Sequence, residues 1–185
     1  MPYIVAVSGA SGSGKSTFAD ALKTYLEKNN GRVCVIAADR YFKKDLPKMI
    51  SPATGEEASD WNHPDSVDMP AFLAAVTEAK ESGVYDYIII EGVTIFCHEA
   101  VRELADVKLY IDATIEMRIY RRIARNVVLK GQTIEFIGGY YLNFARWREK
   151  EYSLPSAQYA DWHVDNEYGF DIKAEGAKIL AALNA

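Results

Sequence analysis

A glycine-rich loop near the start of the chain constrains the fold more than any other feature. Residues Gly9–Ser16 fit the pattern G-x-x-x-x-G-K-[ST] at every specified position. The loop follows an apolar segment of strand length, Tyr3–Ser8, and precedes a segment with helical spacing, Ser16–Lys28. Glycines let successive N–H groups face a phosphate, and the start of a helix adds a positive dipole end. The loop therefore predicts a strand–loop–helix unit that binds a nucleoside triphosphate; a turn that binds nothing is the alternative.

The spacing within this phosphate-binding loop assigns roles to two side chains. Lys15 is expected to reach the β- and γ-phosphates, and the Ser16 hydroxyl to coordinate Mg²⁺. The residues expected to contact the nucleotide are Gly9, Ala10, Ser11, Gly12, Ser13, Gly14, Lys15, Ser16 and Thr17.

Apolar runs of strand length alternate with longer segments of helical period. The expected strands are Tyr3–Ser8, Val33–Ala37, Tyr87–Ile90, Val107–Ile111 and Trp162–Asp165. The expected helices are Ser16–Lys28, Asp68–Glu81, Thr114–Val127, Thr133–Tyr152 and Ile172–Leu183. Continuous apolar strands separated by helices are typical of a parallel sheet covered on both faces. We therefore expect an α/β fold of three layers.

Composition excludes several classes of protein. The 185 residues are 49% hydrophobic and 25% charged, which is typical of a globular domain rather than a disordered chain. The formal net charge of −5 gives no basic footprint for general nucleic-acid binding. No apolar run is long enough for a membrane helix, and the start lacks the features of a signal peptide. Two distant cysteines, Cys34 and Cys97, favour a reducing compartment, so we expect a cytoplasmic protein.

Three carboxylates follow expected strands. Asp39, Glu91 and Asp112 lie where strands of a parallel sheet end, beside the edge at which such sheets bind ligands. A carboxylate there can hold Mg²⁺ or accept a proton from an attacking hydroxyl, and it can also simply mark where the chain meets solvent. Asp39 also opens a long segment without clear period, 39–64, which is either a functional loop or a tolerated insertion.

Four arginines share one face of an expected helix. Arg118, Arg121, Arg122 and Arg125 have the spacing i, i+3, i+4 and i+7, so their like charges repel unless an anion lies against them. Guanidinium groups match phosphate oxygens, which favours a role in phosphoryl transfer over a merely solvated face. The histidines show no metal-ligand spacing. Tyr140 and Tyr141 are interpreted as packing residues, with a pocket wall as the alternative.

The ordered motifs resemble the uridine kinase-like branch of P-loop kinases, which includes phosphoribulokinases and nicotinamide riboside kinases. The resemblance covers nearly the whole chain. It depends on the loop Gly9–Ser16, on Ala38-Asp39-Arg40-Tyr41-Phe42-Lys43, on Trp61-Asn62-His63-Pro64-Asp65, on Ile90-Glu91-Gly92, on the arginine segment Arg118–Asn126, and on Gly131–Pro155 with Tyr159-Ala160-Asp161. The phosphate-binding loop is common to many families, whereas this ordered set is much more specific.

The resemblance implies a P-loop kinase fold that phosphorylates a ribose hydroxyl with ATP or GTP and Mg²⁺. It implies that Asp39 is the base, that Asp65 binds the ribose, and that Glu91 joins Ser16 at the metal. Arg121, Arg122 and Arg125 are then expected to close over the phosphates, with Lys15 as a further catalytic residue. Other substrate contacts are expected from Tyr41, Phe42, His63 and Arg118. We expect one domain over residues 1–185, with a five-stranded parallel sheet, a helical arginine-bearing lid near 118–132 and an acceptor-side loop near 39–65.

One family element is missing from the sequence. Uridine kinases carry a pyrimidine-binding hairpin between the segment that matches His63-Pro64-Asp65 and the Glu-Gly strand, but here one expected helix fills most of that stretch. The acceptor is therefore open among a nucleoside, nicotinamide riboside and another hydroxyl compound. A nucleoside monophosphate kinase and a non-catalytic nucleotide-binding regulatory protein remain alternatives. The expected partner is a small molecule rather than nucleic acid or membrane, and a homo-oligomer is compatible with the sequence.

Overall fold

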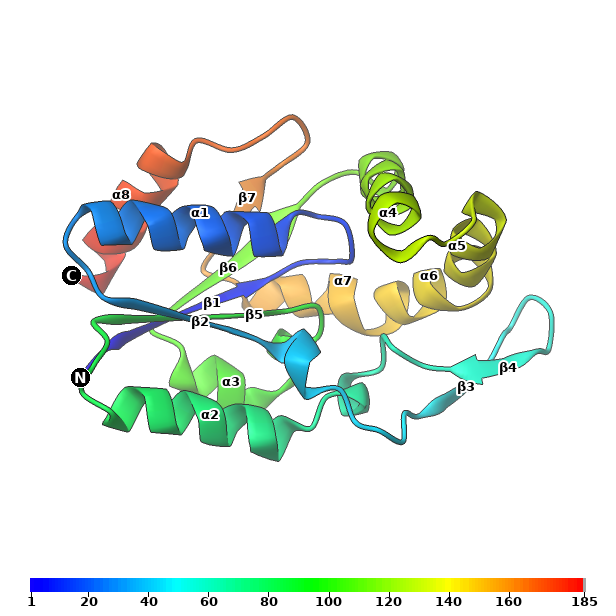
Figure 1. Cartoon of the computed structure of the whole chain (residues 1–185), viewed down its shortest axis with the longest axis horizontal. Coiled ribbons are helices and arrows are strands. Elements are labelled where there is room, and N and C mark those ends of the chain that lie inside the picture. The colour runs from blue at the N-terminus through cyan, green and yellow to red at the C-terminus, as the bar shows by residue number, and fades with distance from the viewer. Residues whose placement is uncertain (185) are drawn as a thin grey trace.

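Five parallel strands form the central sheet of the computed structural model, which describes residues 1–184. Their order is β2-β5-β1-β6-β7, so the first strand is central, β5 lies between it and the edge strand β2, and β6 and β7 follow on the other side. The strands are β1 (Tyr3–Ser8), β2 (Val33–Ala37), β5 (Tyr87–Gly92), β6 (Val107–Asp112) and β7 (Trp162–Asp165). All five expected strands are present, and the predicted three-layer α/β fold is confirmed (Figure 1).

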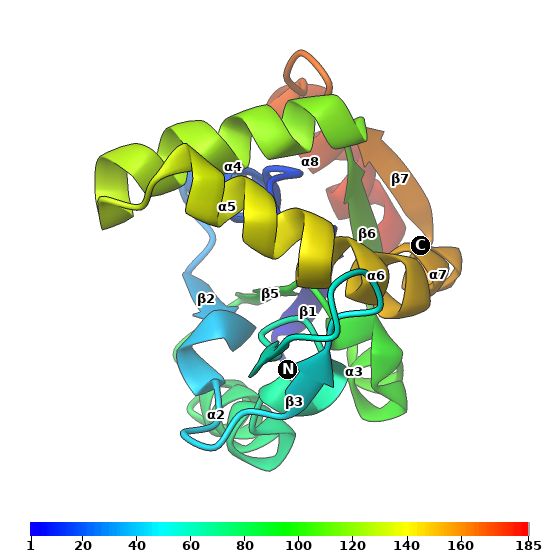
Figure 2. The ribbon, with the colours of Figure 1, turned by 90° about the vertical axis from the view of Figure 1, so that its right-hand side faces the viewer.

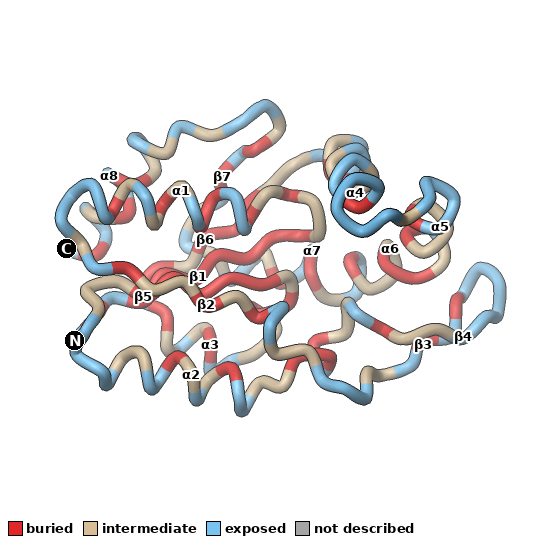
Figure 3. The backbone as a smooth tube through the Cα atoms, in the orientation of Figure 1, coloured by how far each residue is buried: buried red, intermediate tan, exposed pale blue. Residues whose placement is uncertain are grey.

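Helices cover both faces of this sheet. Ile4 and Ala6 of β1 pack toward α2 (Met69–Glu81) and α3 (Glu99–Leu104), whereas Val5 and Val7 pack toward α1 (Lys15–Lys28) and α8 (Ile172–Leu183). The strands are consequently buried on both sides, as Figure 3 shows, which explains their continuous apolar sequences. Within residues 1–184, no helix has both the length and the apolar character needed to cross a bilayer.

The remaining elements gather at the carboxyl edge of the sheet, because parallel strands all end there. Figure 2 looks onto this edge and shows α4 and α5 on one side and the small hairpin on the other. The elements are β3 (Lys48–Ile50), β4 (Glu57–Ser59), α4 (Ile115–Lys130), α5 (Ile134–Tyr140), α6 (Arg146–Arg148) and α7 (Leu154–Ser156).

Two segments differ from their sequence-based description. The segment 39–64 is not irregular throughout, because it contains the β3–β4 hairpin, whose three-residue strands are too short to show a period. The expected single helix Thr133–Tyr152 is wrong in its regularity: π-helical turns at Tyr141–Ala145 and Glu149–Ser153 interrupt it, and it continues to Ser156. The buried Glu149 in the second of these turns binds Arg118 of α4, a tertiary partner that helical spacing does not predict.

Candidate active site

The phosphate-binding loop is shaped by what packs against it. Gly12 and Gly14 have φ angles of 86° and 95°, in the left-handed region that other residues rarely adopt. A Cβ atom would lie 2.4 Å from the carbonyl oxygen of Arg118 at Gly12, and 2.2 Å from Nδ2 of Asn166 at Gly14. These two positions therefore need glycine both for backbone conformation and for the close approach of α4 and of the segment after β7.

The start of α1 offers unpaired amides to an anion. Gly14 caps the helix without a side-chain hydrogen bond, and the first turn has no acidic residue. Lys15 is buried there, with its Nζ 3.8 Å from Oε2 of Glu91. The amide of Asn166 donates to the Ser13 carbonyl oxygen at 2.7 Å, which holds the loop in place from outside. These features fit an anion such as phosphate, and the binding of nucleotide phosphates by this loop remains a prediction.

Ser16 and Glu91 place oxygen ligands beside this loop. Because β5 neighbours β1, the Glu91 carboxylate reaches α1 and accepts a hydrogen bond from the Ser16 hydroxyl at 2.9 Å. Its other oxygen, Oε2, is buried and has no hydrogen-bond partner within residues 1–184. The same part of the chain has no cluster of three or more histidine, cysteine or carboxylate residues. Two hard oxygen ligands, completed by phosphate oxygens, fit Mg²⁺, which commonly uses few protein ligands.

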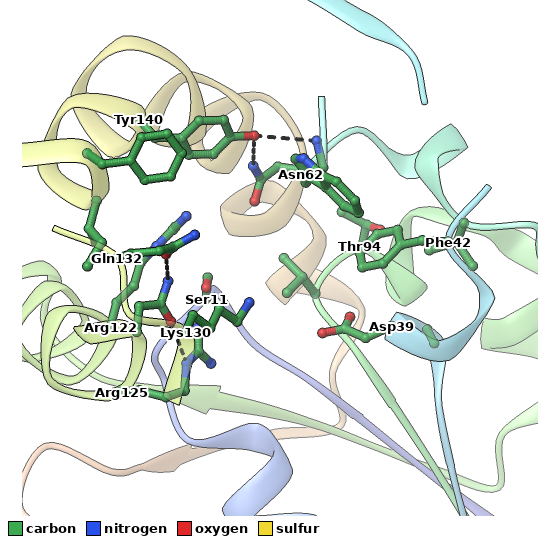
Figure 4. A pocket seen from close by; sticks show the side chains of 17 residues that line it. Ser11, Asp39, Phe42, Asn62, Thr94, Arg122, Arg125, Lys130, Gln132 and Tyr140 are labelled. Atoms are coloured by element: carbon green, nitrogen blue, oxygen red, sulfur yellow. Dashed lines mark hydrogen bonds between the residues drawn. The ribbon is translucent and has the colours of Figure 1, made fainter. Parts of the chain in front are cut away.

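A cavity of about 320 Å³ opens between the phosphate-binding loop, the turn after β2, and helices α4 and α5 (Figure 4). The carboxylate of Asp39 lies on its wall; Asp39 is an exposed residue of the 3₁₀ turn Ala38–Tyr41 that directly follows β2. Ser11 contributes from the phosphate-binding loop. The lining residues are Ser11, Ala38, Asp39, Phe42, Trp61, Asn62, Val67, Val93, Thr94, Arg122, Arg125, Asn126, Lys130, Gln132, Phe136, Ile137 and Tyr140.

The arginines of α4 reach different partners. Arg122 and Arg125 line the cavity, and Arg122 packs over the ring of Tyr140 with 5.7 Å between the guanidinium carbon and the ring centroid. Burial lowers the pKa of Arg122, and its Nε and Nη1 have no hydrogen-bond partner within residues 1–184. Arg121 instead donates to the carbonyl oxygens of Asn166 and Glu167 at 2.8 and 3.0 Å, and at 3.5 Å to that of Ser13 in the phosphate-binding loop. Its expected role at the phosphates remains a prediction. The cavity therefore presents positive charge that an anionic ligand would satisfy.

Comparison with known proteins decides the family. Residues 56–171 match the Phosphoribulokinase / Uridine kinase family. The chain belongs to this family. A uridine kinase of Borreliella burgdorferi (strain ZS7) is 30% identical to it over 185 residues, covering 87% of this chain and 85% of the relative. The predicted resemblance is confirmed, and membership of this kinase family makes the chain a phosphotransferase.

Solved structures agree on the fold of this phosphoribulokinase/uridine kinase family member. A possible uridine kinase from Bacillus stearothermophilus is similar with a TM-score of 0.55 and 18% identity, covering 88% of both chains. Shikimate kinase from Acinetobacter baumannii, in complex with shikimate, is similar with a TM-score of 0.54 and 14% identity, covering 100% of this chain and 94% of that one. The P-loop kinase fold expected from the resemblance is therefore confirmed.

Four residues expected to bind substrate lie outside the cavity wall: Tyr41, His63, Asp65 and Arg118. Tyr41 packs edge-on against Phe72, with ring centroids 5.6 Å apart. His63 is held at both ring nitrogens, by the Asp65 amide and by the hydroxyl of Tyr152, each at 3.1 Å. The Asp65 carboxylate points outward, with 71% of its side chain exposed. The substrate-binding roles of these residues remain predictions.

Arg118 has a partner of its own within the fold. Its Nη1 donates to Oε1 of Glu149 at 2.9 Å, and both side chains are almost fully buried. The other oxygen of Glu149 accepts from the hydroxyl of Tyr141 at 3.3 Å. Although Arg118 shares its helical stripe with Arg122 and Arg125, its side chain joins α4 to the π-helical turn Glu149–Ser153 and is not part of the cavity wall.

Some residues of the site were not assigned a role from the sequence. Trp61 and Asn62 line the cavity but entered only as part of a family motif, and Tyr140, interpreted as a packing residue with a pocket wall as the alternative, also lines it. Asn166, which holds the phosphate-binding loop, directly follows β7. The rule that polar residues after parallel strands gather at one edge would have identified Asn166.

Proposed function

We propose that this protein transfers the γ-phosphoryl group of ATP to a hydroxyl group of a nucleoside or a related ribosyl compound. The observation that carries the proposal is the shared cavity, whose wall includes Asp39, Ser11 of the phosphate-binding loop, and the guanidinium groups of Arg122 and Arg125. In-line phosphoryl transfer needs a base, a phosphate site and positive charge around one acceptor oxygen. The similarity to a uridine kinase supports a nucleoside as the acceptor.

Asp39 is proposed as the base. Its exposed position on the cavity wall lets the carboxylate accept a hydrogen bond from the acceptor hydroxyl, orient the oxygen toward the phosphate-binding loop and take its proton. A positioned general base contributes about 10²- to 10⁴-fold to the rate. The remaining strand-end carboxylates are engaged elsewhere, Glu91 with Ser16 and Asp112 with His163.

The cationic residues are proposed to stabilise the transferring group. Lys15, Arg122 and Arg125 offset the charge on the phosphate oxygens, and the guanidinium groups remain protonated throughout. Ser16 and Glu91 would hold Mg²⁺, which, when bound, neutralises charge on the phosphate oxygens. We propose that residues 118–132 act as a lid that excludes water, opposite an acceptor-side loop at 39–65, within a single domain.

The test is ADP release by the purified protein with Mg-ATP against uridine, cytidine, nicotinamide riboside, ribose and CMP. We expect release that depends on a nucleoside or riboside, with a product one phosphoryl group heavier by mass spectrometry. Stimulation by CMP alone would replace the proposal with a monophosphate kinase. ATP binding without stimulation by any acceptor in the panel would instead favour a nucleotide-binding regulatory protein.

A further inference from the structure

Arg121 on the arginine stripe of α4 is bonded to backbone groups and does not line the cavity. Its Nη2 group donates to the carbonyl oxygens of Asn166 and Glu167, at 2.8 and 3.0 Å. Its Nη1 group donates to the Ser13 carbonyl oxygen at 3.5 Å. A guanidinium carries five N–H donors and no acceptor, so much of the donor capacity of Arg121 is used on the backbone.

The Ser13 carbonyl oxygen receives a second donor from outside the phosphate-binding loop. Nδ2 of Asn166 donates to it at 2.7 Å, and Asn166 is buried. The backbone amide of Asn166 in turn donates to the Asp112 carbonyl oxygen at 2.8 Å, which fixes Asn166 to the end of β6. The Ser13 carbonyl is therefore held by two side chains, one from α4 and one from the segment after β7.

A carbonyl that is held in this way also orients the amide that follows it. The Ser13–Gly14 peptide bond is trans, so the Ser13 oxygen and the Gly14 N–H point in opposite directions within one plane. Because Asn166 and Arg121 hold the oxygen on the outer side of the loop, the Gly14 N–H is directed to the inner side, where the phosphates are expected. Donation by a cation also polarises the peptide, which strengthens this N–H as a donor.

The same segment after β7 fixes the start of α4. The Glu167 carboxylate accepts from the backbone amide and the hydroxyl of Thr114, both at 2.7 Å. These hydrogen bonds lower the pKa of Glu167, so the carboxylate is ionised at neutral pH. Thr114 is the N-cap residue of α4, and Arg121 lies two turns further along the helix. Residues 166–167 thus hold α4 at two points, which keeps Arg121 in place beside the loop.

We infer that Arg121 is a positioning residue: together with Asn166 it fixes the Ser13 carbonyl and thereby directs the Gly14 amide at the phosphates of the nucleotide. This role takes the place of the direct contact with the phosphates that the sequence led us to expect for Arg121. The inference rests on the nucleotide-binding part of the proposed function, and it adds how the phosphate-binding loop is kept in a binding conformation.

The test measures the Kd values of Mg-ATP and Mg-ADP by calorimetry. Arg121→Met keeps an unbranched side chain but removes every donor. Because the amides of the loop cradle phosphates that ATP and ADP share, both Kd values should rise by the same factor, about 10-fold. A loss several times larger for ATP than for ADP would mean that Arg121 acts on the γ-phosphate itself, and wild-type values for both would mean that the loop does not depend on it. Either result would overturn the inference.

A second variant separates positioning from a direct contact with the shared phosphates. Asn166→Ala removes the other donor to the Ser13 oxygen and should weaken ATP and ADP equally; it also carries the test if Arg121→Met does not fold. Because both side chains act on one carbonyl, the loss in the double variant should differ from the product of the two single losses by about 3-fold or more. A loss equal to that product would mean that the two residues act independently, and would overturn the inference.

Two control variants remove the same kinds of hydrogen bond away from the loop. Arg102 donates to the Phe96 carbonyl oxygen at 2.8 Å, and Nδ2 of Asn29 donates to the Tyr25 carbonyl oxygen at 2.8 Å. Arg102→Met and Asn29→Ala should both retain the wild-type Kd values. If they weaken nucleotide binding as much as Arg121→Met does, the effect of Arg121 is one of general stability, and its positioning role is wrong.

Failure of the proposed function would be recognised separately. A wild-type protein that binds both nucleotides but phosphorylates no acceptor would overturn the proposed kinase reaction, while the affinities of the variants would still decide the role of Arg121. A wild-type protein that binds neither nucleotide would overturn both proposals.

Discussion

At the scale of single residues, the three strand-end carboxylates differ by their partners. Glu91 is buried and accepts a hydrogen bond from the Ser16 hydroxyl, and Oδ2 of Asp112 lies 2.5 Å from Nδ1 of His163. Asp39 is exposed on the cavity wall. A carboxylate that serves as a base must be able to approach a substrate hydroxyl, which favours Asp39 over the other two. The sequence alone could not rank them, because all three follow apolar strands in the same way.

Asp39→Asn tests this assignment. The amide keeps the size of the side chain but cannot take a proton at neutral pH, so we expect turnover to fall by about 10²- to 10⁴-fold. The affinity for ATP, measured by calorimetry, should change little. Asp45→Asn makes the same change in the same loop at an exposed position outside the cavity and should retain full activity. Normal turnover by Asp39→Asn would show that another group is the base.

At the scale of elements, α4 is held by a buried ion pair. Arg118 and Glu149 are each at most 5% exposed, and Glu149 also accepts from Tyr141. The pair joins the base of the arginine-bearing helix to the π-bulged helix that leads to α7. Such a pair contributes little net stability compared with apolar residues, but removal of one partner leaves an uncompensated buried charge.

Glu149→Leu should therefore destabilise the protein by about 3–5 kcal/mol, measured by urea unfolding. The double variant Arg118→Met/Glu149→Leu should recover most of this loss, because no buried charge then remains unpaired. If the double variant is as unstable as the sum of both single variants, the two side chains do not act as a pair.

A second ion pair joins the starts of β2 and β5. Asp86 accepts from the Arg32 guanidinium at 2.9 and 2.8 Å and from its backbone amide at 2.8 Å. The hydrogen bonds from Arg32 lower the pKa of Asp86 from 3.8 to about 2. The native state thus favours the ionised form, so this contribution to stability is present above about pH 4 and is lost as the pH falls toward 2.

Asp86→Asn should accordingly flatten the dependence of stability on pH between about 4 and 2, measured as melting temperature against pH. The effect should be modest and should shrink in high salt, because the pair is exposed. Asp20→Asn on the surface of α1 is the matched control. If the melting temperature of Asp86→Asn fell between about pH 4 and 2 as steeply as that of the wild type, the native and unfolded states would bind the Asp86 proton equally.

At the scale of the whole molecule, ligand binding should couple distant parts of the chain. The phosphate-binding loop contacts α4 through Gly12 and the segment after β7 through Asn166, while Glu91 approaches from β5. A ligand that binds only the folded state raises its stability by mass action, by about 2.7 kcal/mol at a hundred times Kd.

Mg-ATP should therefore raise the melting temperature in proportion to the logarithm of its concentration, and EDTA should reduce the shift. Lys15→Ala should abolish most of the shift, because the buried ammonium group is lost from the phosphate site. A shift in Lys15→Ala as large as in the wild type would place the nucleotide elsewhere.

Local pattern was enough to predict the five strands, the helices α1, α2, α4 and α8 to within a few residues, and the phosphate-binding loop. A strand buried on both faces is a continuous apolar run, and a helix buried on one side repeats apolar residues at helical spacing, so both can be recognised from neighbouring residues alone. Helical spacing could not show that Arg118 pairs with Glu149 whereas Arg122 lines the cavity, because both arginines lie on one stripe of α4.

Contacts between distant segments of the chain determine which polar side chains pair with one another at the site. Asn62 and Tyr140 are 78 residues apart in sequence, and their hydrogen bond forms because α5 crosses above the segment after β4. Arg118 turns to Glu149 because a π-helical turn brings that carboxylate to a buried position. The partner of a polar side chain depends on packing between elements, and periodicity along one element carries no information about it.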